Sequence, residues 1–543
     1  MKVKTLLVAM LAMVATVFTA CSDDDETSST ALQSITLSQS TLALTAGSSS
    51  SLTYTLTPSG TTETGVAWTS SNTAVATVSS TGLVTAVAEG TANITVTSTS
   101  NSSISATCVV TVSADAPATI TVSGDVSGTW EANTIVYVNG HITVPENASL
   151  TIEEGVQVIF SDAGVGTSHT PIEFIVDGSL YSKGTADNPV RMTVAEELRT
   201  TENIFAGLWG GIIATENCPE MLIDNTIIEY TGGPVNQDSP SAVKGIYTPG
   251  DDYDPQITTN NVNGVYVITN STLRYGVSDA IYMMGGKAII EGNTFEANGE
   301  TGGEAINVKA GCKVDAAFIL IYSPNTNGFK LSSSGQNDDT GRTQALIRAY
   351  NNTIINSGWR RDGVKGGSVY VEKNALVSVF NNLIVNCKFK AMTPNWGNPG
   401  AKAGAALECV IDYNFYAAGT AESTLAQDIA DGTTNSYLGY TLENEDIYPE
   451  YIDLHSIVSA SAGDENTNPG FVNFAYLTNP LTDYVLSDSW DFHVTAGSPV
   501  LSGAYEGTDS NMQPYFGASG LTVNGTTYTT TAPAARFGAF GTN

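Results

Sequence analysis

The sequence predicts an all-β protein in which a small β-sandwich precedes a large parallel β-helix. Valine, isoleucine, threonine and tyrosine dominate the apolar segments, and these residue types favour strands. After the first twenty residues, no long stretch has the 3.6-residue apolar period of an amphipathic helix. In the second part of the chain, short strand-like phrases that begin with Asn or Ser recur, which is the pattern of stacked coils.

The first element, residues 1–20, is a secretion signal rather than part of the fold. Two lysines precede an apolar run from residue 6 to residue 20 that is too short to span a membrane as a helix. The run leads into Phe18-Thr19-Ala20-Cys21, which resembles a lipobox, where the cysteine is acylated and the signal is removed. The resemblance implies that Cys21 carries a lipid. The alternative is an ordinary secretion signal that happens to end in cysteine.

Residues 21–31 form an acidic tether, with the run Asp23-Asp24-Asp25-Glu26 close behind the cysteine. Such a run resembles the export signal of surface-displayed lipoproteins in some Gram-negative bacteria. Like charges also keep a chain extended, so a solvated tether explains the run as well. We therefore expect the lipid to anchor the protein in the outer membrane, which would be its partner membrane. We expect the rest of the chain to be exposed at the cell surface.

Residues 32–113 form a compact unit of short alternating strands separated by Gly, Ser and Asn clusters, as in a small β-sandwich. Its most specific strings are Trp68-Thr69-Ser70-Ser71-Asn72, Ala74-Val75-Ala76-Thr77-Val78, Gly82-Leu83-Val84-Thr85-Ala86 and Gly90-Thr91-Ala92. On these strings the unit resembles the bacterial immunoglobulin-like domain of group 2. The resemblance implies a stalk or adhesion module without chemistry of its own, and we expect Trp68 in its core.

Residues 119–543 form the second unit, the β-helix. Its recurring phrases begin at Asn225, Ser271, Asn293, Asn352, Asn382 and Asn414. The steps between them are 46, 22, 59, 30 and 32 residues, and the shortest suits one coil of a parallel β-helix. The longer steps suit one or two coils with inserted loops. Because parallel coils stack like side chains, we expect these residues to form a structural ladder that pairs buried amides.

Both ends of this unit resemble those of right-handed β-helix surface proteins. The opening coils are indicated by residues 150–158, 183–189 and 209–212, and the closing segment by residues 491–494, 497–501 and 537–540. The expected fold class is therefore all-β, an N-terminal immunoglobulin-like β-sandwich plus a large right-handed parallel β-helix. This fold carries lyases, hydrolases, adhesins and proteins without known activity, so it implies little about function.

Charge and cysteine content exclude some functions. A net charge of −33 argues against nucleic acid as a partner, because phosphate binding needs a positive face. The cysteines besides Cys21 are Cys108, Cys218, Cys312, Cys387 and Cys409. They are widely spaced and lack CxxC pairs, so no zinc site is indicated. Their odd number precludes a complete intramolecular disulfide set, and we expect buried free thiols.

Acidic residues offer two candidate sites. Asn337-Asp338-Asp339 holds a candidate carboxylate pair for a glycosidase, although an exposed polar loop explains this segment as well. Asp251, Asp252 and Asp254 lie in a long insertion, residues 231–262, and could hold calcium against a uronate. They lack the spacing of a strong calcium loop, so a solvated acidic loop is the competing interpretation. No other cofactor is indicated.

The most informative signal is a basic segment within this acidic chain. Nine of the 21 Lys and Arg residues fall within residues 342–402, which hold only two acids, a net of +7. The 30-residue step from Asn352 to Asn382 also takes Trp359 to Phe389 and Arg360 to Lys390. We therefore expect an aromatic pair and a cationic pair on neighbouring coils, which pack about 5 Å apart.

Further candidates flank these pairs. Arg361 and Lys365 lie in the loop that leaves the same coil, and Trp396 follows in the next loop. Aromatic rings pack on sugar C–H groups, and arginine binds carboxylate or sulfate through paired hydrogen bonds. We therefore predict that the residues of this basic segment bind an anionic glycan. The competing interpretation is that its cations pair with acids of residues 403–543 or of a neighbouring loop.

Two functions follow from these patterns. The first is a surface protein that binds an extracellular polysaccharide through the β-helix, with the β-sandwich as a spacer. The second is a polysaccharide lyase or glycoside hydrolase on the same scaffold, with Arg360, Arg361, Lys365 or Lys390 as the base. The absence of a complete catalytic set favours binding over catalysis. A purely structural surface protein is a third possibility.

Overall fold

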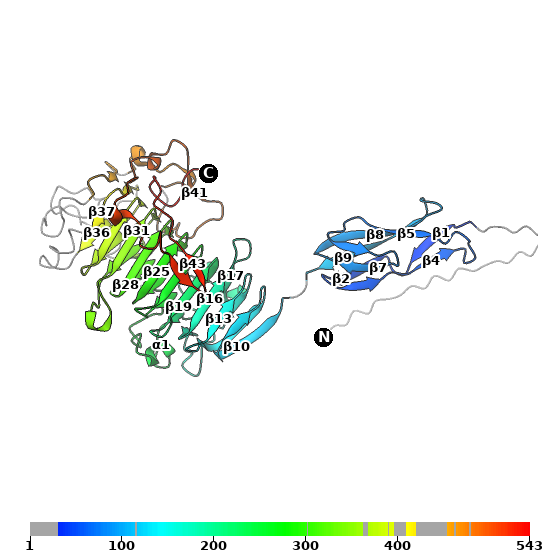
Figure 1. Cartoon of the computed structure of the whole chain (residues 1–543), viewed down its shortest axis with the longest axis horizontal. Coiled ribbons are helices and arrows are strands. Elements are labelled where there is room, and N and C mark those ends of the chain that lie inside the picture. Colours follow the sequence, from blue (N-terminus) through cyan, green and yellow to red (C-terminus); the bar gives the residue numbers. More distant parts are fainter. Residues whose placement is uncertain are drawn as a thin grey trace, which may run out of the picture. The chain divides into compact units, whose positions relative to one another are not determined.

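The computed structural model of the protein describes residues 31–114, 117–300, 302–361, 367–388, 390–395, 409–419, 453–460, 463–476 and 479–543. The chain divides into two compact units between residues 116 and 117. Antiparallel sheets make up the first unit, and long parallel sheets typical of a β-helix make up the second (Figure 1). The prediction of an all-β fold is confirmed.

The first unit contains three small sheets. Their strands are β1 (Ser34–Leu37), β2 (Thr41–Thr45), β3 (Ser49–Ser51), β4 (Tyr54–Thr57), β5 (Val66–Ser70), β6 (Ala76–Val78), β7 (Leu83–Ala86), β8 (Gly90–Ser98) and β9 (Ser105–Ser113). The largest sheet has the order β2-β9-β8-β5, and the others pair β1 with β4 and order β3-β7-β6. Every pairing in this unit is antiparallel except that of β2 with β9.

The core of the first unit follows from the alternation of its strands. Ile94 on β8 and Cys108 and Val110 on β9 are fully buried, while the residues between them face solvent. Trp68 on β5 is half-buried and packs against this core. Its ring makes an edge-to-face contact with the ring of Tyr54, with centroids 6.1 Å apart. Trp68 was expected inside the core, and it lies at the margin of the core.

The second unit is a coil of three parallel faces. The first face is the sheet β11 (Gly128–Trp130), β13 (Ser149–Ile152), β16 (Ser179–Lys183), β19 (Glu220–Asp224), β22 (Val265–Thr269), β25 (Gly286–Glu291), β28 (Cys312–Ala317), β31 (Leu346–Tyr350), β34 (Leu376–Phe380) and β37 (Val410–Ile411). Figure 1 shows several of these strands side by side along the unit.

Two further faces share the longest sheet. The second face is β14 (Gln157–Phe160), β17 (Val190–Val194), β20 (Thr226–Glu229), β23 (Thr272–Arg274), β26 (Thr294–Glu296), β29 (Leu320–Tyr322), β32 (Thr353–Ile355), β35 (Leu383–Val385) and β38 (Phe415–Ala417). The third face is β15 (Phe174–Val176), β18 (Ile212–Ala214), β21 (Ile257–Thr259), β24 (Ile281–Met283), β27 (Ile306–Val308), β30 (Phe329–Ser332), β33 (Gly367–Glu372) and β36 (Lys390–Asn395). At the two ends of this sheet lie β10 (Thr119–Asp125), β12 (Ile135–Val144) and β39 (Ile457–Val458).

Short helical turns occur in the loops between faces and in the C-terminal segment. They are η1 (Glu196–Leu198), η2 (Thr201–Asn203), α1 (Pro240–Val243), η3 (Asp338–Thr340), η4 (Glu465–Thr467), η5 (Pro499–Leu501) and η6 (Ser510–Met512). No helix among the described residues is long and apolar enough to cross a membrane.

Asparagine forms several of the tight corners between the first and second faces. Asn270, Asn351 and Asn381 adopt left-handed backbone conformations, with φ of 50°, 51° and 56°. Asparagine tolerates this region better than most residues, so one residue can turn the chain from one strand into the next.

A ladder of side-chain amides follows each of these corners. The Asn352 N–H donates to Asn382 Oδ1 at 3.0 Å, and the Asn382 N–H donates to Asn414 Oδ1 at 3.2 Å. Ser271 and Asn293 are linked in the same way at 2.9 Å. The predicted structural ladder is therefore confirmed for these five residues.

The ladder differs from the prediction at one step. Asn225 is a corner residue with a φ of 46°, and Thr226 is the ladder residue, since its N–H donates to Ser271 Oγ at 3.0 Å. The alignment on Asn225 was wrong by one residue because asparagine serves both positions, at the corner and in the ladder. Because Leu320 pairs with Thr294, Ile319 occupies the ladder position of its coil. The ladder therefore has no polar side chain at this position.

The segment after residue 470 returns along the outside of the coil. Its hairpin, β42 (Leu521–Val523) with β43 (Thr526–Tyr528), lies near β16 and β19 of the first face (Figure 1). Leu521 and Val523 pack in one cluster with Leu222 and Val267 of that face. Asp315 is buried beneath this segment and accepts from the N–H groups of Tyr515 and Phe516, each at 2.9 Å. The expected closing segment is thus a cover along the coil and not a further coil.

The pair β40 (Phe471–Asn473) and β41 (Asp491–Val494) covers the second face in the same way. Phe474 and Phe492 surround the ring of Tyr322, with centroids 6.1 and 6.3 Å away. This contact buries outward apolar side chains that a bare coil would leave in water.

Three of the cysteines are buried free thiols, as expected: Cys108, Cys218 and Cys312. Burial raises the pKa of Cys218 and of Cys312 to about 12, so neither thiol is a ready nucleophile. Cys409 is buried and donates to the Ala375 carbonyl at 3.6 Å.

Candidate functional site

Trp359, a residue of the predicted glycan site, is built into the fold. It lies in the turn after β32, its side chain is 7% exposed, and its Nε1 donates to the Asn386 carbonyl at 2.7 Å. This hydrogen bond from the indole to the next coil fixes the turn. Its buried ring offers little surface to a sugar.

Arg360 clamps the turns of earlier coils. Its guanidinium donates to the carbonyls of Asn298 at 3.0 Å, Gly299 at 2.6 Å and Ser323 at 2.9 Å. It also lies over the rings of Phe205 and Tyr484, 4.6 and 5.6 Å from their centroids. Burial lowers the pKa of Arg360 to about 10, which still leaves it charged at neutral pH.

The expected stacking of Arg360 on Lys390 is wrong. The 30-residue step holds through the second face, where Thr353 pairs with Leu383, but Lys390 opens β36 and pairs with Gly367. The turn after β32 is long and the turn after β35 is short. The 30-residue spacing therefore no longer relates equivalent positions between the second and third faces. A single step length cannot be carried across loops of different length.

The other residues of the basic segment are only partly described. Arg361 is half-buried, donates to Thr326 Oγ1 at 3.5 Å, and accepts at its carbonyl from the Lys388 ammonium. Lys365, Phe389 and Trp396 lie outside the described residues. The role of this segment in glycan binding stays a prediction.

The predicted acidic sites do not assemble. Asp338 and Asp339 are exposed in η3, where Asn337 Oδ1 accepts from the Asp339 N–H at 3.2 Å. Asp252 accepts from the Thr248 N–H at 2.7 Å, and Asp251 is exposed.

Asp254, the third residue of the predicted calcium set, is buried, whereas Asp251 is exposed. It is 1% exposed and faces Glu173 in the interior. Throughout the described part of the chain, no group of three or more His, Cys, Asp or Glu side chains is arranged to hold a metal ion. The prediction failed because the insertion folds inward at Asp254, which sequence spacing does not show.

A groove on the third face brings together residues that the sequence does not connect. It consists of two adjoining hollows of about 330 and 370 Å³ that share Gly245, Ile246, Asn260 and Arg342. The first hollow is completed by Asp177, Thr215, Glu216, Asn217 and Lys244. The second is completed by Tyr282, Met284, Lys309, Ser334 and Gly335.

The position of the groove follows from the coil. Its floor residues come directly after successive third-face strands, such as Thr215 after β18, Asn260 after β21, Met284 after β24 and Lys309 after β27. Parallel strands in register place these residues in a row along the coil axis. The groove therefore crosses several coils and suits an extended ligand.

The insertion between β20 and β21 forms one wall of the groove. It carries α1 and supplies Lys244, Gly245 and Ile246 to the lining. Lys244 pairs with Asp177 of an earlier coil at 3.0 Å, and Tyr247 bonds to Thr258 Oγ1 at 2.6 Å. These contacts fasten the insertion against the third face.

An aromatic ring and a cation meet in the second hollow. Tyr282 on β24 is partly buried, and the Lys309 ammonium lies 5.3 Å from its ring centroid. Burial, and then the nearby charge of Lys330, lower the pKa of Lys309. This lysine is therefore easier to deprotonate than an exposed one.

Arg342 lies where the two hollows join. It reaches from the loop after β30, and its guanidinium donates to Asn260 Oδ1 at 2.6 Å and to the Met284 carbonyl. These bonds hold the cation across two coils. A planar donor fixed in this way suits a carboxylate or sulfate group of a ligand.

Sequence reasoning missed Lys309, Tyr282 and Asn260. The usable signal was their common position relative to the strands Ile257–Thr259, Ile281–Met283 and Ile306–Val308, each of which begins with isoleucine. Arg342 was counted in the basic segment, but no spacing links it to these coils. It reaches them through a loop of irregular structure.

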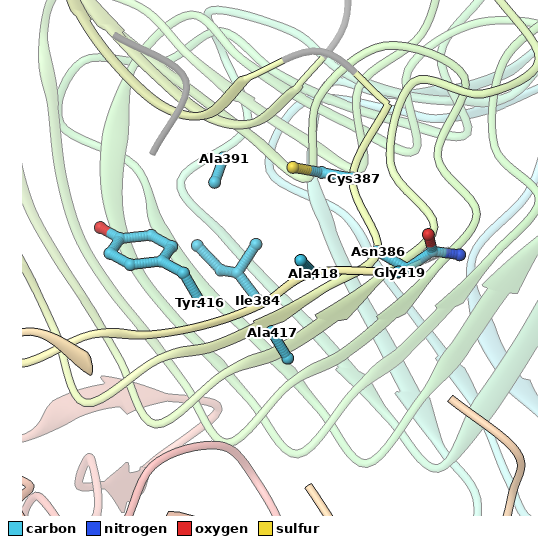
Figure 2. Close-up of a pocket in the computed structure, with 8 residues that line it drawn as sticks. All are labelled: Ile384, Asn386, Cys387, Ala391, Tyr416, Ala417, Ala418 and Gly419. Carbon is cyan, nitrogen blue, oxygen red and sulfur yellow. The ribbon is translucent and has the colours of Figure 1, made fainter. Parts of the chain in front are cut away.

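Another hollow lies at the other end of the coil, between β35 and β38. Figure 2 shows its lining, in which the Cys387 sulfur points to the side where Ala391 lies. Its volume is about 20 Å³, which is room for about one water molecule. It is too small for a sugar.

Two family models match the chain. Residues 31–108 match the bacterial Ig-like domain of group 2, and residues 119–251 match the pectate-lyase like β-helix domain. The chain carries a bacterial Ig-like domain followed by a pectate-lyase-like β-helix domain. No curated protein matches it.

The pectate-lyase-like domain suggests a role in binding or modifying carbohydrate. Its match covers the opening coils and most of the insertion that walls the groove. Tyr282, Lys309 and Arg342 lie beyond the matched residues, so their part in such a role rests on the geometry of the groove.

Proposed function

We propose that the protein is a cell-surface lipoprotein that binds an extracellular glycan in the groove of its pectate-lyase-like domain. The lipobox-like end of the signal at Cys21 and the acidic tether support the anchor and the location. The Ig-like domain serves as the spacer between the anchor and the β-helix.

The groove itself carries the proposal. Its hollows of about 330 and 370 Å³ adjoin along the coil axis, and each is large enough for about one or two sugar rings. Saccharides are recognised by hydrogen bonds to planar polar groups and by packing of C–H faces on aromatic rings. Asn260 and Arg342 supply the first kind of contact, and Tyr282 supplies the second.

The charges of the groove favour an acidic glycan. Lys309 and Arg342 line the second hollow, whose lining includes no carboxylate among the described residues. The chain as a whole has a net charge of −33, so it repels polyanions except where cations gather. A glycan with carboxylate or sulfate groups would place them at these two cations.

Retention on immobilised polysaccharides tests the proposal. The chain from residue 22 onward is passed over acidic and neutral polysaccharides, alongside a Tyr282→Ala, Arg342→Ala double variant. We expect the native chain to be retained by one acidic polysaccharide and the variant to pass through. Equal retention of both chains would contradict the groove as the binding site.

A second function, a polysaccharide lyase, is favoured by one observation. Lys309 has a lowered pKa and lines the same hollow as Arg342, so the groove holds a base together with a cation that would neutralise a uronate. Neutralisation acidifies the proton next to the carboxylate, and the neutral amine would remove it. Arg360 does not fit the role of base, because its guanidinium donates to three carbonyls.

The lyase is distinguished from the binding protein by its product. Elimination leaves an unsaturated uronate, whose absorbance rises at about 235 nm, in the range expected for a conjugated enol ether formed by proton abstraction. Lys309→Ala would abolish this absorbance while Lys287→Ala, an exposed lysine of the first face, would leave it unchanged. Retention without any such absorbance would leave binding as the function.

A further inference from the structure

Two buried carboxyl groups, Glu173 and Asp254, face each other beneath the insertion that walls the groove. Glu173 precedes β15 and is fully buried, and Asp254 stands near the end of the insertion and is 1% exposed. Both pack over Gly210, where an added Cβ would lie 2.6 Å from Asp254 Oδ2 and 3.0 Å from Glu173 Cγ. The missing side chain of this glycine makes room for the pair.

The two carboxyl groups share a proton. They lie side by side over Gly210, and two carboxylates in contact inside a protein cannot both be ionised. Burial and the neighbouring Glu173 raise the pKa of Asp254 well above its usual range, whereas the hydrogen bonds that Glu173 accepts oppose the rise in its own pKa. The proton therefore belongs to Asp254, which donates to Glu173.

The pair fastens the insertion to the coil. Ser241 of α1 donates its N–H to Glu173 Oε2 at 2.7 Å and its hydroxyl to Glu173 Oε1 at 2.8 Å. The carboxylate of the coil thus holds the start of α1, and Asp254 adds the third donor from the end of the same insertion. The middle and the end of the insertion thus meet at one buried charge.

The groups around the pair do not replace the shared proton with a cation. His141 accepts from the Glu173 N–H at 3.1 Å, and burial lowers the pKa of His141, which keeps it neutral near pH 7. Asp252 adds a negative charge that raises the pKa of Asp254 further.

Two further titratable groups of the insertion are engaged nearby. Lys244 pairs with Asp177 at 3.0 Å, and the Tyr247 hydroxyl bonds to Thr258 Oγ1. Burial raises the pKa of Tyr247 well above its usual range, so its hydroxyl stays neutral over the pH range considered below. The pair at Glu173 is a buried carboxyl pair whose ionisation bears on how the insertion is held.

We propose that the proton shared by Glu173 and Asp254 is a latch that holds the insertion against the third face and releases it as the pH rises. The insertion supplies Lys244, Gly245 and Ile246 to the groove, so its release removes one wall. The latch stands on the buried pair alone. Its effect on glycan binding rests on the proposed function.

The direction of the effect follows from proton linkage. In the open insertion both carboxyl groups are in water and ionise near pH 4. In the closed insertion Asp254 keeps its proton, so opening releases one proton throughout the range between the open and closed pKa values. The equilibrium constant for opening then rises about tenfold for each pH unit. The insertion is held most firmly in mildly acidic solution.

Asp254→Asn is the variant that separates the latch from other causes. Its amide donates a hydrogen bond to Glu173 as the protonated acid does, but it does not titrate. We expect opening of this variant to be independent of pH. Ser241→Ala weakens the anchor at every pH but keeps both carboxyl groups, so we expect its opening constant to be larger and to keep the tenfold slope.

Amide hydrogen exchange measures the opening. Full-length chain in detergent is exchanged between pH 7 and 9, where His141 is neutral, and rates for residues 234–253 are corrected for intrinsic exchange. The expected slope is about tenfold per pH unit in the native chain and none in Asp254→Asn. Equal slopes in the two chains, or no slope in the native chain, would overturn the latch. If Asp254→Asn does not fold, Ser241→Ala provides the test. Loss of the pH slope in that variant would overturn the latch.

Retention on the acidic polysaccharide is measured over the same pH range. A native chain that loses affinity with rising pH while Asp254→Asn does not would support control of the groove by the latch. Affinity that is the same at each pH in both chains, despite the exchange slope, would overturn that control. No retention at any pH would refute the proposed function and leave the exchange result, and the latch, standing.

Discussion

The ammonium group of Lys309 lies 5.3 Å from the ring centroid of Tyr282, on the outward side of the third face. The contact arises because Tyr282 pairs with Asn307 across β24 and β27, and Lys309 follows two residues later on the same outward side. The cation covers part of the ring and leaves the rest to the groove. A sugar that carries a negative charge can use both groups at once.

Loss of the Tyr282 ring should weaken binding of the acidic glycan. Tyr282→Ala removes the aromatic surface of the second hollow, and we expect an increase in Kd of about tenfold, or roughly 1.4 kcal/mol. Titration calorimetry with a defined oligosaccharide measures the change. Tyr137→Ala removes an exposed ring on β12, outside the groove lining, and serves as the control. An equal loss in both variants would argue against stacking in the groove.

The charge of Lys309 should matter only for acidic ligands. Lys309→Gln keeps a polar side chain of similar reach, so binding of a neutral glycan should be unchanged while binding of an acidic one weakens several-fold. Because salt weakens the attraction between the lysine and a charged ligand, the difference should shrink at about 1 M salt. Affinity chromatography at two salt concentrations tests this. A salt-independent loss would indicate damage to the groove instead of a lost charge.

Arg360 should contribute to stability and not to binding. Arg360→Ala removes three hydrogen bonds to buried turn carbonyls, and we expect a loss in the free energy of unfolding on the order of 2–4 kcal/mol. Thermal unfolding measures this loss. The Kd for glycan, determined well below the melting temperature, should stay unchanged. A large loss of affinity in a variant of native stability would restore the basic segment as the binding site.

The sequence was sufficient for the fold because its signals are local and repeated. Corner and ladder asparagines recur in several coils, and the strands between them are short and apolar. Asn352, Asn382 and Asn414 fall on one ladder because each stands directly before a second-face strand, β32, β35 or β38. Asn225 was misplaced because two neighbouring positions of the coil accept asparagine, and only the pairing of the strands distinguishes them.

The candidate site was harder to predict because it depends on loop length. Arg360 and Lys390 share a step of 30 residues, yet the chain between β32 and β33 is longer than that between β35 and β36, so they leave register. Arg342 reaches Asn260 across several coils through an irregular loop. Contacts of this kind have no periodic signal, whereas the ladder does.

The amide ladder should make a measurable contribution to stability. Asn382 Oδ1 accepts from the N–H and the Nδ2 of Asn352 at 3.0 and 2.9 Å, so Asn382→Ala leaves buried donors without partners. We expect a cost of about 2–3 kcal/mol in the free energy of unfolding. Asn263→Ala, at an exposed position, should cost less than about 0.5 kcal/mol. Similar costs for both would show that the ladder does not stabilise the coil.

The anchor gives a prediction about protease treatment of intact cells. Residues 5–182 contain no Lys or Arg, so trypsin has no site between the proposed lipid at Cys21 and Lys183. If the chain is displayed outward, every tryptic fragment that stays on the membrane should include the whole Ig-like domain, which an antibody to that domain detects. Cys21→Ala should lose incorporated fatty acid and leave the membrane fraction. A chain that trypsin cuts only after the cells are lysed would face inward, contrary to the proposed display at the surface.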